Sequence, residues 1–295
     1  MKLSRITALA VSLTALVGLA GCATSEAPPA DPSIETIVIG SQAYYSNEII
    51  AETYAQILED SGYPVERKFS LGQRDVYIPA LEAGEIDLIP EYTGNLLQFF
   101  DPAATETAAD EVYAALGSAL PAGLTAFAMS PATDQDSYNV TKEFADANSL
   151  VSIEDLAKVT GLKLGGAPEL AERPYGPSGL LSVYGVTVEF QATGETTVDS
   201  LVAGIVDMAN VYSADPRIEQ LGLVTLSDPR GLFLASNVVP VASGVVSDYV
   251  AYLIDKVSAA MTAEDLVAMN VRSVDEKLSA SVIAREWLLS KGLVK

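Results

Sequence analysis

The sequence predicts an α/β fold with two lobes and a ligand cleft between them. From residue 34 onwards, short apolar segments suited to buried strands alternate with amphipathic segments suited to helices, which is typical of largely parallel sheets. Glycines such as Gly40 and Gly62 mark the ends of these segments. A second alternating run begins near Thr133, and an apolar extended stretch from Asn237 leads into closing helices. Two lobes joined by two crossings enclose a cleft, where small ligands commonly bind.

The first lobe is expected to comprise residues 34–132 and 237–295. Its predicted elements are, in order, a strand at 37–39, a helix at 47–60, a strand at 65–69, a helix at 74–83, a strand at 86–89, a helix at 105–120, a strand at 125–129, an extended segment at 237–242 and helices at 247–261, 263–272 and 281–290. Ser46 is placed to cap the first helix, and Pro90 is expected to stop the strand before it. Thr262 and Asp265 form a capping-box pattern.

The second lobe is expected to span residues 133–236. Its predicted elements are short helices around Glu143 and Glu154, a strand at 162–164, a glycine- and proline-rich loop at 165–179, a helix at 180–184, a strand at 187–190, a helix at 198–203 and a strand at 208–211.

The N-terminus has the three-part pattern of a secretory signal. Basic residues precede an apolar run, and Leu19-Ala20-Gly21-Cys22 follows, which resembles a bacterial lipobox. Residues 1–21 are therefore expected to be a lipoprotein signal peptide, with lipid carried on Cys22 and a flexible tether over 22–33. An ordinary signal peptide is the alternative, and the apolar run is shorter than a membrane span requires. The protein is expected to be extracytoplasmic and anchored by lipid to the bacterial cell membrane.

Composition argues against several classes of function. The chain has no histidine, and Cys22 is its one cysteine, so histidine-based catalysis and histidine or cysteine metal sites are excluded. The net charge is −22, and loss of two basic residues with the leader leaves 15 positive against 39 negative side chains, or −24. Such a surface repels nucleic acid. We therefore expect no enzyme, no cofactor, no metal and no nucleic-acid partner.

Several strings resemble the substrate-binding proteins of bacterial osmoprotectant ABC importers, the receptors for glycine betaine, carnitine and choline. The strings are IGSQAYYSNEIIAETYAQILEDSGY (39–63), VYIPALEAGEIDLIPEYTGN (76–95), DQDSYNVTKEFA (134–145), RPYGPSG (173–179), GIVDMANVYSADPRI (204–218) and DPRGLFLASNVVPV (228–241). The resemblance implies a type II periplasmic-binding-protein fold. It also implies delivery of a quaternary ammonium compound to a permease and its ATPase by a protein expected to be a monomer.

The resemblance places Tyr92, Tyr138 and Tyr212 in an aromatic cage. A quaternary ammonium group has no N–H to donate, so a site must hold it by cation–π contact and shape, for which tyrosine is well suited. The chain contains 13 Tyr, against 7 Phe and 1 Trp. Each of these tyrosines has an alternative role in half-buried packing.

A fourth cage aromatic, common near the return crossing in betaine-binding relatives, is replaced here by Ser236 followed by Asn237. Tyr44 and Tyr45 follow the first strand, and either is a candidate for the absent wall. The alternative is that one packs on the first helix and the other faces solvent.

The polar end of the predicted site combines two charged residues with two neutral residues that replace those found in relatives. Arg173 matches an arginine that reaches a ligand carboxylate, or else pairs with a nearby glutamate. Gln42 stands where relatives can place a lysine, and Asn95 where some have a threonine. Asp136 either faces the positive head group, which favours a true cation such as choline, or caps a turn.

Other functions remain open on sequence grounds. A receptor for another solute, such as an ergothioneine-like betaine or an amino acid, is the nearest alternative. An enzyme with paired carboxylates would need Glu85 with Asp87, or Glu82 with Glu85. A surface adhesin or sensor is a third class.

Overall fold

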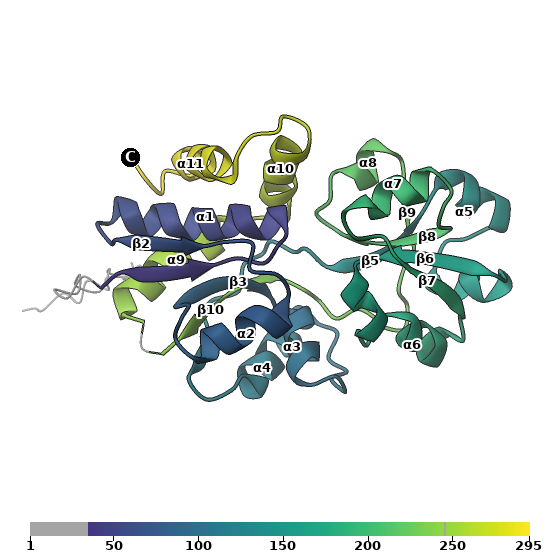
Figure 1. Ribbon diagram of the computed structural model, residues 1–295, viewed down its shortest axis with the longest axis horizontal. Coiled ribbons are helices and arrows are strands. Elements are labelled where there is room, and N and C mark those ends of the chain that lie inside the picture. Colours follow the sequence, from purple (N-terminus) through teal and green to yellow (C-terminus); the bar gives the residue numbers. More distant parts are fainter. Residues whose placement is uncertain (1–34, 245) are drawn as a thin grey trace, which may run out of the picture.

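The computed structural model describes residues 35–244 and 246–295. The predicted signal peptide, Cys22 and the tether lie outside the described residues. The described chain forms two lobes, each built on a five-stranded sheet with helices on both faces (Figure 1). In this part of the chain, no helix is long and apolar enough to cross a membrane.

The first sheet has the strand order β2-β1-β3-β10-β4. Strand β1 runs parallel to β2 and β3, whereas β10 returns from the far part of the chain and runs antiparallel to β3 and β4. The strands are β1 (Ile37–Gly40), β2 (Val65–Lys68), β3 (Leu88–Tyr92), β4 (Leu124–Ala126) and β10 (Val238–Ser243).

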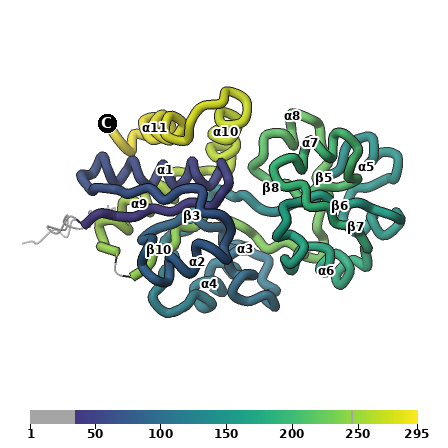
Figure 2. Tube along the Cα trace, in the orientation of Figure 1, coloured from purple at the N-terminus to yellow at the C-terminus, as the bar shows by residue number. Residues whose placement is uncertain are grey.

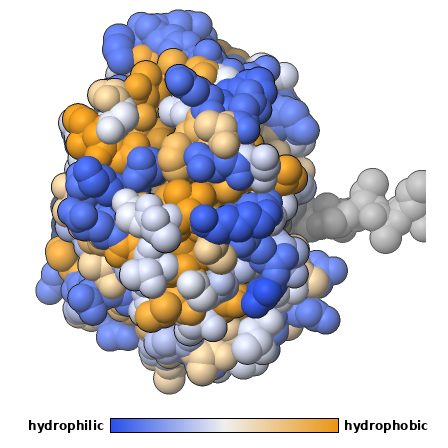
Figure 3. Space-filling model, turned by 90° about the vertical axis from the view of Figure 1, so that its right-hand side faces the viewer, coloured by the Kyte–Doolittle hydropathy of each residue, from blue (hydrophilic) through white to orange (hydrophobic). Residues whose placement is uncertain are grey.

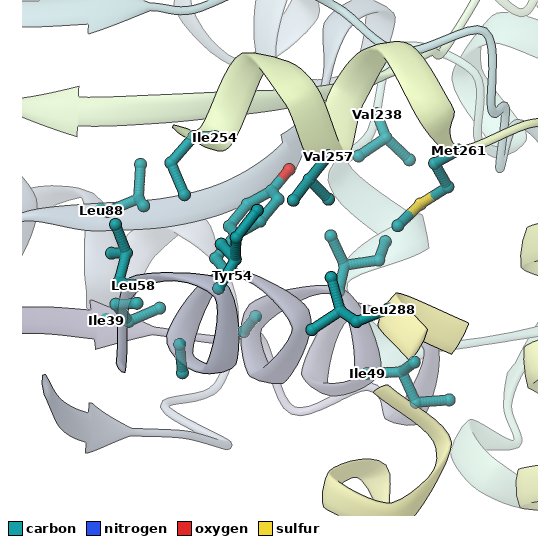
Figure 4. Packing of buried hydrophobic residues seen from close by; sticks show 14 of the residues in the cluster. Ile39, Ile49, Tyr54, Leu58, Leu88, Val238, Ile254, Val257, Met261 and Leu288 are labelled. Atoms are coloured by element: carbon teal, nitrogen blue, oxygen red, sulfur yellow. The ribbon is translucent and has the colours of Figure 1, made fainter. Parts of the chain in front are cut away.

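Each face of this sheet is covered by its own helices and has its own apolar core. In one core, Tyr54 projects from its helix toward Ile254 and Val257 of a facing helix (Figure 4). The helices on this face are α1 (Tyr45–Asp60), α9 (Asp248–Ala260), α10 (Ala263–Val274) and α11 (Ala280–Ser290). The opposite face is covered by α2 (Arg74–Glu82), α3 (Thr93–Phe100) and α4 (Ala109–Ala119).

The second sheet has the equivalent order β7-β6-β8-β5-β9, and β5 is antiparallel to β8. Its strands are β5 (Asp136–Val140), β6 (Leu162–Gly166), β7 (Val188–Ala192), β8 (Met208–Tyr212) and β9 (Val224–Thr225). Its α-helices are α5 (Lys142–Asn148), α6 (Pro177–Gly179), α7 (Thr197–Val202) and α8 (Arg217–Gln220), with 3-10 turns at Ile153–Lys158, Pro168–Glu172 and Gly194–Thr196 and a π-helical turn at Leu180–Tyr184. The end of this lobe that faces away from the first mixes apolar and hydrophilic residues (Figure 3).

Helix starts test the local predictions. The capping box is confirmed, because the Asp265 N–H donates to Thr262 Oγ1 at 3.2 Å and the Thr262 N–H donates to Asp265 Oδ2 at 3.0 Å. The Ser46 cap is wrong: α1 begins at Tyr45, two residues before the predicted start, and the Ser46 hydroxyl instead accepts a hydrogen bond from Asn270. The helix expected from residue 105 begins at Ala109.

Pro90 does not stop β3, as the sequence predicted, but lies inside it. It stands directly opposite Pro240 in the antiparallel pair of β3 and β10. The carbonyl of Pro240 points away from Pro90, since it accepts a hydrogen bond from the Phe127 N–H at 2.9 Å. In this register neither proline needs an N–H toward the other, so the strand continues to Tyr92.

Candidate functional site

The two crossings between the lobes form a short antiparallel ribbon. Thr133 pairs with Asn237, and the Asp134 N–H donates to the Ser236 carbonyl at 3.1 Å. Figure 2 shows these two segments passing between the lobes. The ends of β1, β3 and β8 and the start of β5 all lie beside this ribbon, so the polar and aromatic residues that follow these strands meet at the lobe interface.

Tyrosines from both lobes pack together at the interface. Tyr44, just before α1 in the first lobe, lies between Tyr45, at a ring-centroid distance of 4.9 Å, and Tyr212 of the second lobe, at 4.8 Å. Tyr92, at the end of β3, is 5 % exposed and near enough to contribute to the raised pKa of Tyr44. We call Tyr44, Tyr45, Tyr92 and Tyr212 the tyrosine cluster. It contains two of the three predicted cage residues and both candidates for the absent wall.

Two buried aspartates adjoin the tyrosine cluster. Asp134 Oδ2 accepts a hydrogen bond from the Tyr44 hydroxyl at 3.2 Å, and Oδ1 accepts one from the Ala214 N–H at 2.9 Å. Burial raises the pKa of Asp134 from 3.8 to about 7, although these donors act in the opposite direction. Burial also raises the pKa of Asp136, which stands opposite Tyr212 in the β5–β8 pair.

Asn95 connects the two lobes beside the cluster. Its Nδ2 donates to Asp136 Oδ2 at 2.5 Å and to the Tyr175 hydroxyl at 3.0 Å, and its Oδ1 accepts from the Ser236 hydroxyl at 2.6 Å. Asn95, Asp136 and Ser236 were predicted from the sequence, but Tyr175 was not. The available signal was its place two residues after Arg173 in the RPYGPSG string.

A buried ion pair underlies the first-lobe side of the interface. Arg74 donates to Glu91 through Nε at 3.0 Å and Nη2 at 2.7 Å, and Glu91 is fully buried. The Tyr77 hydroxyl and Gln42 Nε2 also donate to Glu91, at 2.5 and 3.3 Å. Sequence reasoning placed Gln42 at the site but missed the ion pair that Gln42 contacts. An acidic residue inside an apolar strand, just before Tyr92, was the available signal.

The structure does not bring Tyr138 into the tyrosine cluster. Tyr138 is fully buried in the apolar core of the second lobe, where its ring lies 5.1 Å from that of Phe233 and its hydroxyl donates to the Tyr175 carbonyl at 2.5 Å. The reason is geometric: Tyr138 lies on the same face of β5 as Asp136 but two residues further along, about 7 Å deeper into the lobe. It supports the segment that carries Tyr175.

Two other predicted residues have distinct surroundings. Asn237 Nδ2 donates to the Ser130 carbonyl at 2.9 Å, which holds the return crossing in place. Arg173 Nη2 is buried without a hydrogen-bond partner among the described residues, and Arg173 forms no ion pair with Glu169 or Glu172. Arg173 lies near enough to Tyr175 to affect the pKa of its hydroxyl.

The carboxylates of the enzyme alternative lie elsewhere. Glu82 and Glu85 are exposed, and Asp87 Oδ2 accepts a hydrogen bond from the Val38 N–H at 2.8 Å. Asp87 precedes β3, at the end opposite Tyr92. Across residues 35–244 and 246–295, no group of three or more aspartate or glutamate side chains is arranged to hold a metal ion.

Comparison with known proteins identifies the family of this chain. Residues 35–290 match the family described as the substrate-binding domain of the ABC-type glycine betaine transport system. The chain belongs to this family. It is therefore a substrate-binding protein of ABC transport systems, and the resemblance identified from the sequence is confirmed.

Individual relatives agree with this assignment. The chain is 28% identical over 279 residues to the glycine betaine-binding protein YehZ of Escherichia coli, covering 88% of this chain and 92% of YehZ. It is 23% identical over 273 residues to the ergothioneine transport permease/ergothioneine binding protein EgtU of Helicobacter pylori, covering 87% of this chain and 48% of EgtU.

Solved structures confirm the two-lobed fold. A crystal structure described as a glycine betaine/carnitine/choline ABC transporter superposes with a TM-score of 0.72 at 21% identity, covering 87% of this chain and 99% of that one. The apo structure of Escherichia coli YehZ gives a TM-score of 0.63 at 28% identity, covering 88% of this chain and 99% of that one.

Proposed function

We propose that the protein binds a quaternary ammonium compound, such as glycine betaine, choline or carnitine, between its lobes and delivers it to an ABC importer. The observation that carries this proposal is the 4.8 Å contact between Tyr44 and Tyr212 across the lobe interface, beside Tyr92 and the buried Asp134. Phenol rings attract a methylated cation through their faces, and a nearby carboxylate adds to that attraction. The family and the name of YehZ point to the same class of ligand.

Ligand entry requires the lobes to separate. A void at the interface is lined by the residues around Asn95 and Tyr175 and is too narrow for a water molecule. Rotation about the paired crossings at Thr133 and Asn237 would part Tyr44 from Tyr212. The quaternary nitrogen would then be enclosed as the two lobes close on it.

The two ends of a zwitterionic ligand would meet different groups. The tyrosine cluster and Asp134 would receive the trimethylammonium end. Arg173, whose Nη2 is buried with no hydrogen-bond partner among the described residues, would receive a carboxylate, with Tyr175 and Asn95 close by. In this proposal Tyr138 and Asn237 have supporting roles.

We further propose that the mature protein begins at a lipidated Cys22 and works outside the cell membrane. There it would act as a monomer that passes its ligand to a permease driven by an ATPase. This role includes no catalytic step, cofactor, metal or nucleic acid.

Calorimetry with glycine betaine, choline, carnitine, proline and ergothioneine tests the proposal. We expect saturable binding of at least one quaternary amine and its loss in Tyr212→Ala. Tyr249→Ala is the matched control, because Tyr249 is a partly exposed tyrosine stacked on Tyr252 of α9, in the first lobe. Binding of proline alone would refute the quaternary-amine assignment.

An ergothioneine-like betaine is the second candidate, favoured by the similarity to EgtU. Beside the tyrosine cluster, Gln98 and Gln135 line the interface void, and an amide side chain can form hydrogen bonds with a polar ring. In the same titrations, ergothioneine binding at least tenfold tighter than glycine betaine would select this candidate.

A further inference from the structure

Asp134 is a buried carboxylate that has no cationic partner in the part of the chain that the structure describes. It is 1 % exposed, and no ion pair within residues 35–244 and 246–295 involves it. The Tyr44 hydroxyl and the Ala214 N–H, which donate to it, are neutral. A buried charge needs a counter-charge, so the ionised form of Asp134 is incomplete without a cation.

The neighbouring groups distinguish Asp134 from Asp136. Asp136 accepts a hydrogen bond from Asn95 and is stabilised in its ionised form by the positive charge of Arg74. Among the described residues, the groups near Asp134 include no such free cation. They are the hydroxyls of Tyr44, Tyr45 and Ser46 around the start of α1, that of Tyr92 on β3, Asp136 on β5, and the Asp215–Arg217 ion pair at the start of α8.

We propose that Asp134 faces the positively charged nitrogen of the bound ligand and releases a proton to solvent as that nitrogen binds, so that the protein favours ligands with net positive charge. This inference rests on the proposed function. In the step, the carboxyl O–H bond breaks, the proton passes to the buffer, and the carboxylate that remains is paired with the ligand cation. A zwitterion gains less from this pairing, because its own carboxylate opposes the charge of Asp134.

The raised pKa of Asp134, about 7, sets the pH range of the effect. Near pH 7 about half of the molecules carry the proton, so binding of a cation should release about half a proton. If only the ionised form pairs with the ligand, choline should bind about tenfold more tightly at pH 8 than at pH 6. Glycine betaine should show a smaller change.

The test is titration calorimetry of choline and glycine betaine at pH 6, 7 and 8, with two buffers of different ionisation enthalpy at pH 7. In Asp134→Asn we expect no proton release, a flat pH profile for choline and a lower ratio of choline to glycine betaine affinity. Asp255→Asn is the control, since Asp255 also has a raised pKa but lies on α9 and accepts from the Ala128 N–H. It should behave like wild type.

The outcomes separate this inference from the proposed function. A wild-type protein that binds quaternary amines with no pH dependence, or an Asp134→Asn variant that keeps the proton release, overturns the role of Asp134 alone. A wild-type protein that binds neither probe, nor any other quaternary amine, overturns the proposed function as well. The wild-type pH profile needs no variant, so it decides the matter even if Asp134→Asn fails to fold.

Discussion

Asn270 of α10, in the first lobe, donates a hydrogen bond from Nδ2 to the carbonyl of Ala214, in the second lobe, at 3.0 Å. The same nitrogen donates to Ser46 Oγ at 3.1 Å. Asn270 is fully buried, and Ala214 packs within the apolar core of the first lobe. The Ala214 N–H also donates to Asp134, which lies in the first crossing between the lobes. Ala214 therefore connects α10 to that crossing. Asn270 therefore adds a buried contact between the lobes to those made by Asn95 and by the crossings.

Asn270→Ala should weaken ligand binding by favouring separation of the lobes. Loss of one interlobe hydrogen bond is worth about 1 kcal/mol, or roughly a fivefold loss of affinity, and the unpaired Ala214 carbonyl adds to this. Calorimetry with the ligand found in the screen measures the affinity, and small-angle X-ray scattering measures the separation. Gln220→Ala is the control, because the Gln220–Asp275 contact also spans the lobes but is exposed, and we expect less than a twofold effect. Wild-type affinity and dimensions in Asn270→Ala would show that this contact does not hold the lobes together.

Stability should depend on pH through Asp134. Its pKa is raised on folding, so the folded protein keeps a proton that the unfolded chain loses above pH 4. This stabilising effect is fully present below about pH 4 and is lost as the pH rises to about 7, on the order of 4 kcal/mol in all. Urea unfolding at pH 5 and pH 8 measures it. Asp134→Asn should show a smaller fall in the free energy of unfolding over this range than wild type, and equal falls in the two proteins would contradict the assignment.

Tyr138 and Tyr212 should respond differently to truncation. Tyr138→Ala removes a fully buried ring and should lower the free energy of unfolding by about 3–5 kcal/mol, whereas Tyr138→Phe should cost about 1 kcal/mol for its hydrogen bond. Tyr212 is only partly buried at the lobe interface. Tyr212→Ala should therefore lower the free energy of unfolding by less than about 2 kcal/mol and chiefly reduce ligand affinity. Chemical unfolding and calorimetry on the same samples separate the two effects. Full stability of Tyr138→Ala with loss of binding would place Tyr138 in the site after all.

Strand ends explain how much of the site can be predicted from the sequence. Tyr92 and Tyr212 end strands that alternation and flanking residues reveal, and the hinge position of Asp136 follows from the second alternating run. The role of Tyr138 in the cage stays a prediction, and the resemblance does not show that its side chain lies deep in β5, within the core of the second lobe. Tyr175 lies in an irregular loop whose path no periodicity describes.

The sequence does not reveal which side chains from distant segments of the chain contact one another. Arg74 and Glu91 look like surface charges on a helix and a strand until the sheet order brings them together in the core. Asn270 reaches Ala214 only because the C-terminal helices return to the lobe interface. Such contacts depend on tertiary packing, which local propensity and spacing do not encode.

Gly94, at the start of α3, should tolerate no side chain, because the return crossing packs directly on it. A Cβ there would lie 2.7 Å from the Ala235 carbonyl oxygen and 2.8 Å from Leu234 Cβ. Gly94→Ala should therefore lower the free energy of unfolding by about 1–3 kcal/mol and shift the crossing next to Ser236.

Gly117 provides the matched control for this substitution. It is exposed within α4, and a Cβ there would meet no atom within 4 Å, so Gly117→Ala should stabilise the protein by about 0.5–1 kcal/mol through helix propensity. Chemical unfolding of both variants measures the contrast. Because Ser236 bonds to Asn95 at the interface, Gly94→Ala should also reduce ligand affinity, whereas Gly117→Ala should leave it unchanged. Equal stability and affinity in the two variants would show that the crossing can move away from α3 at no cost.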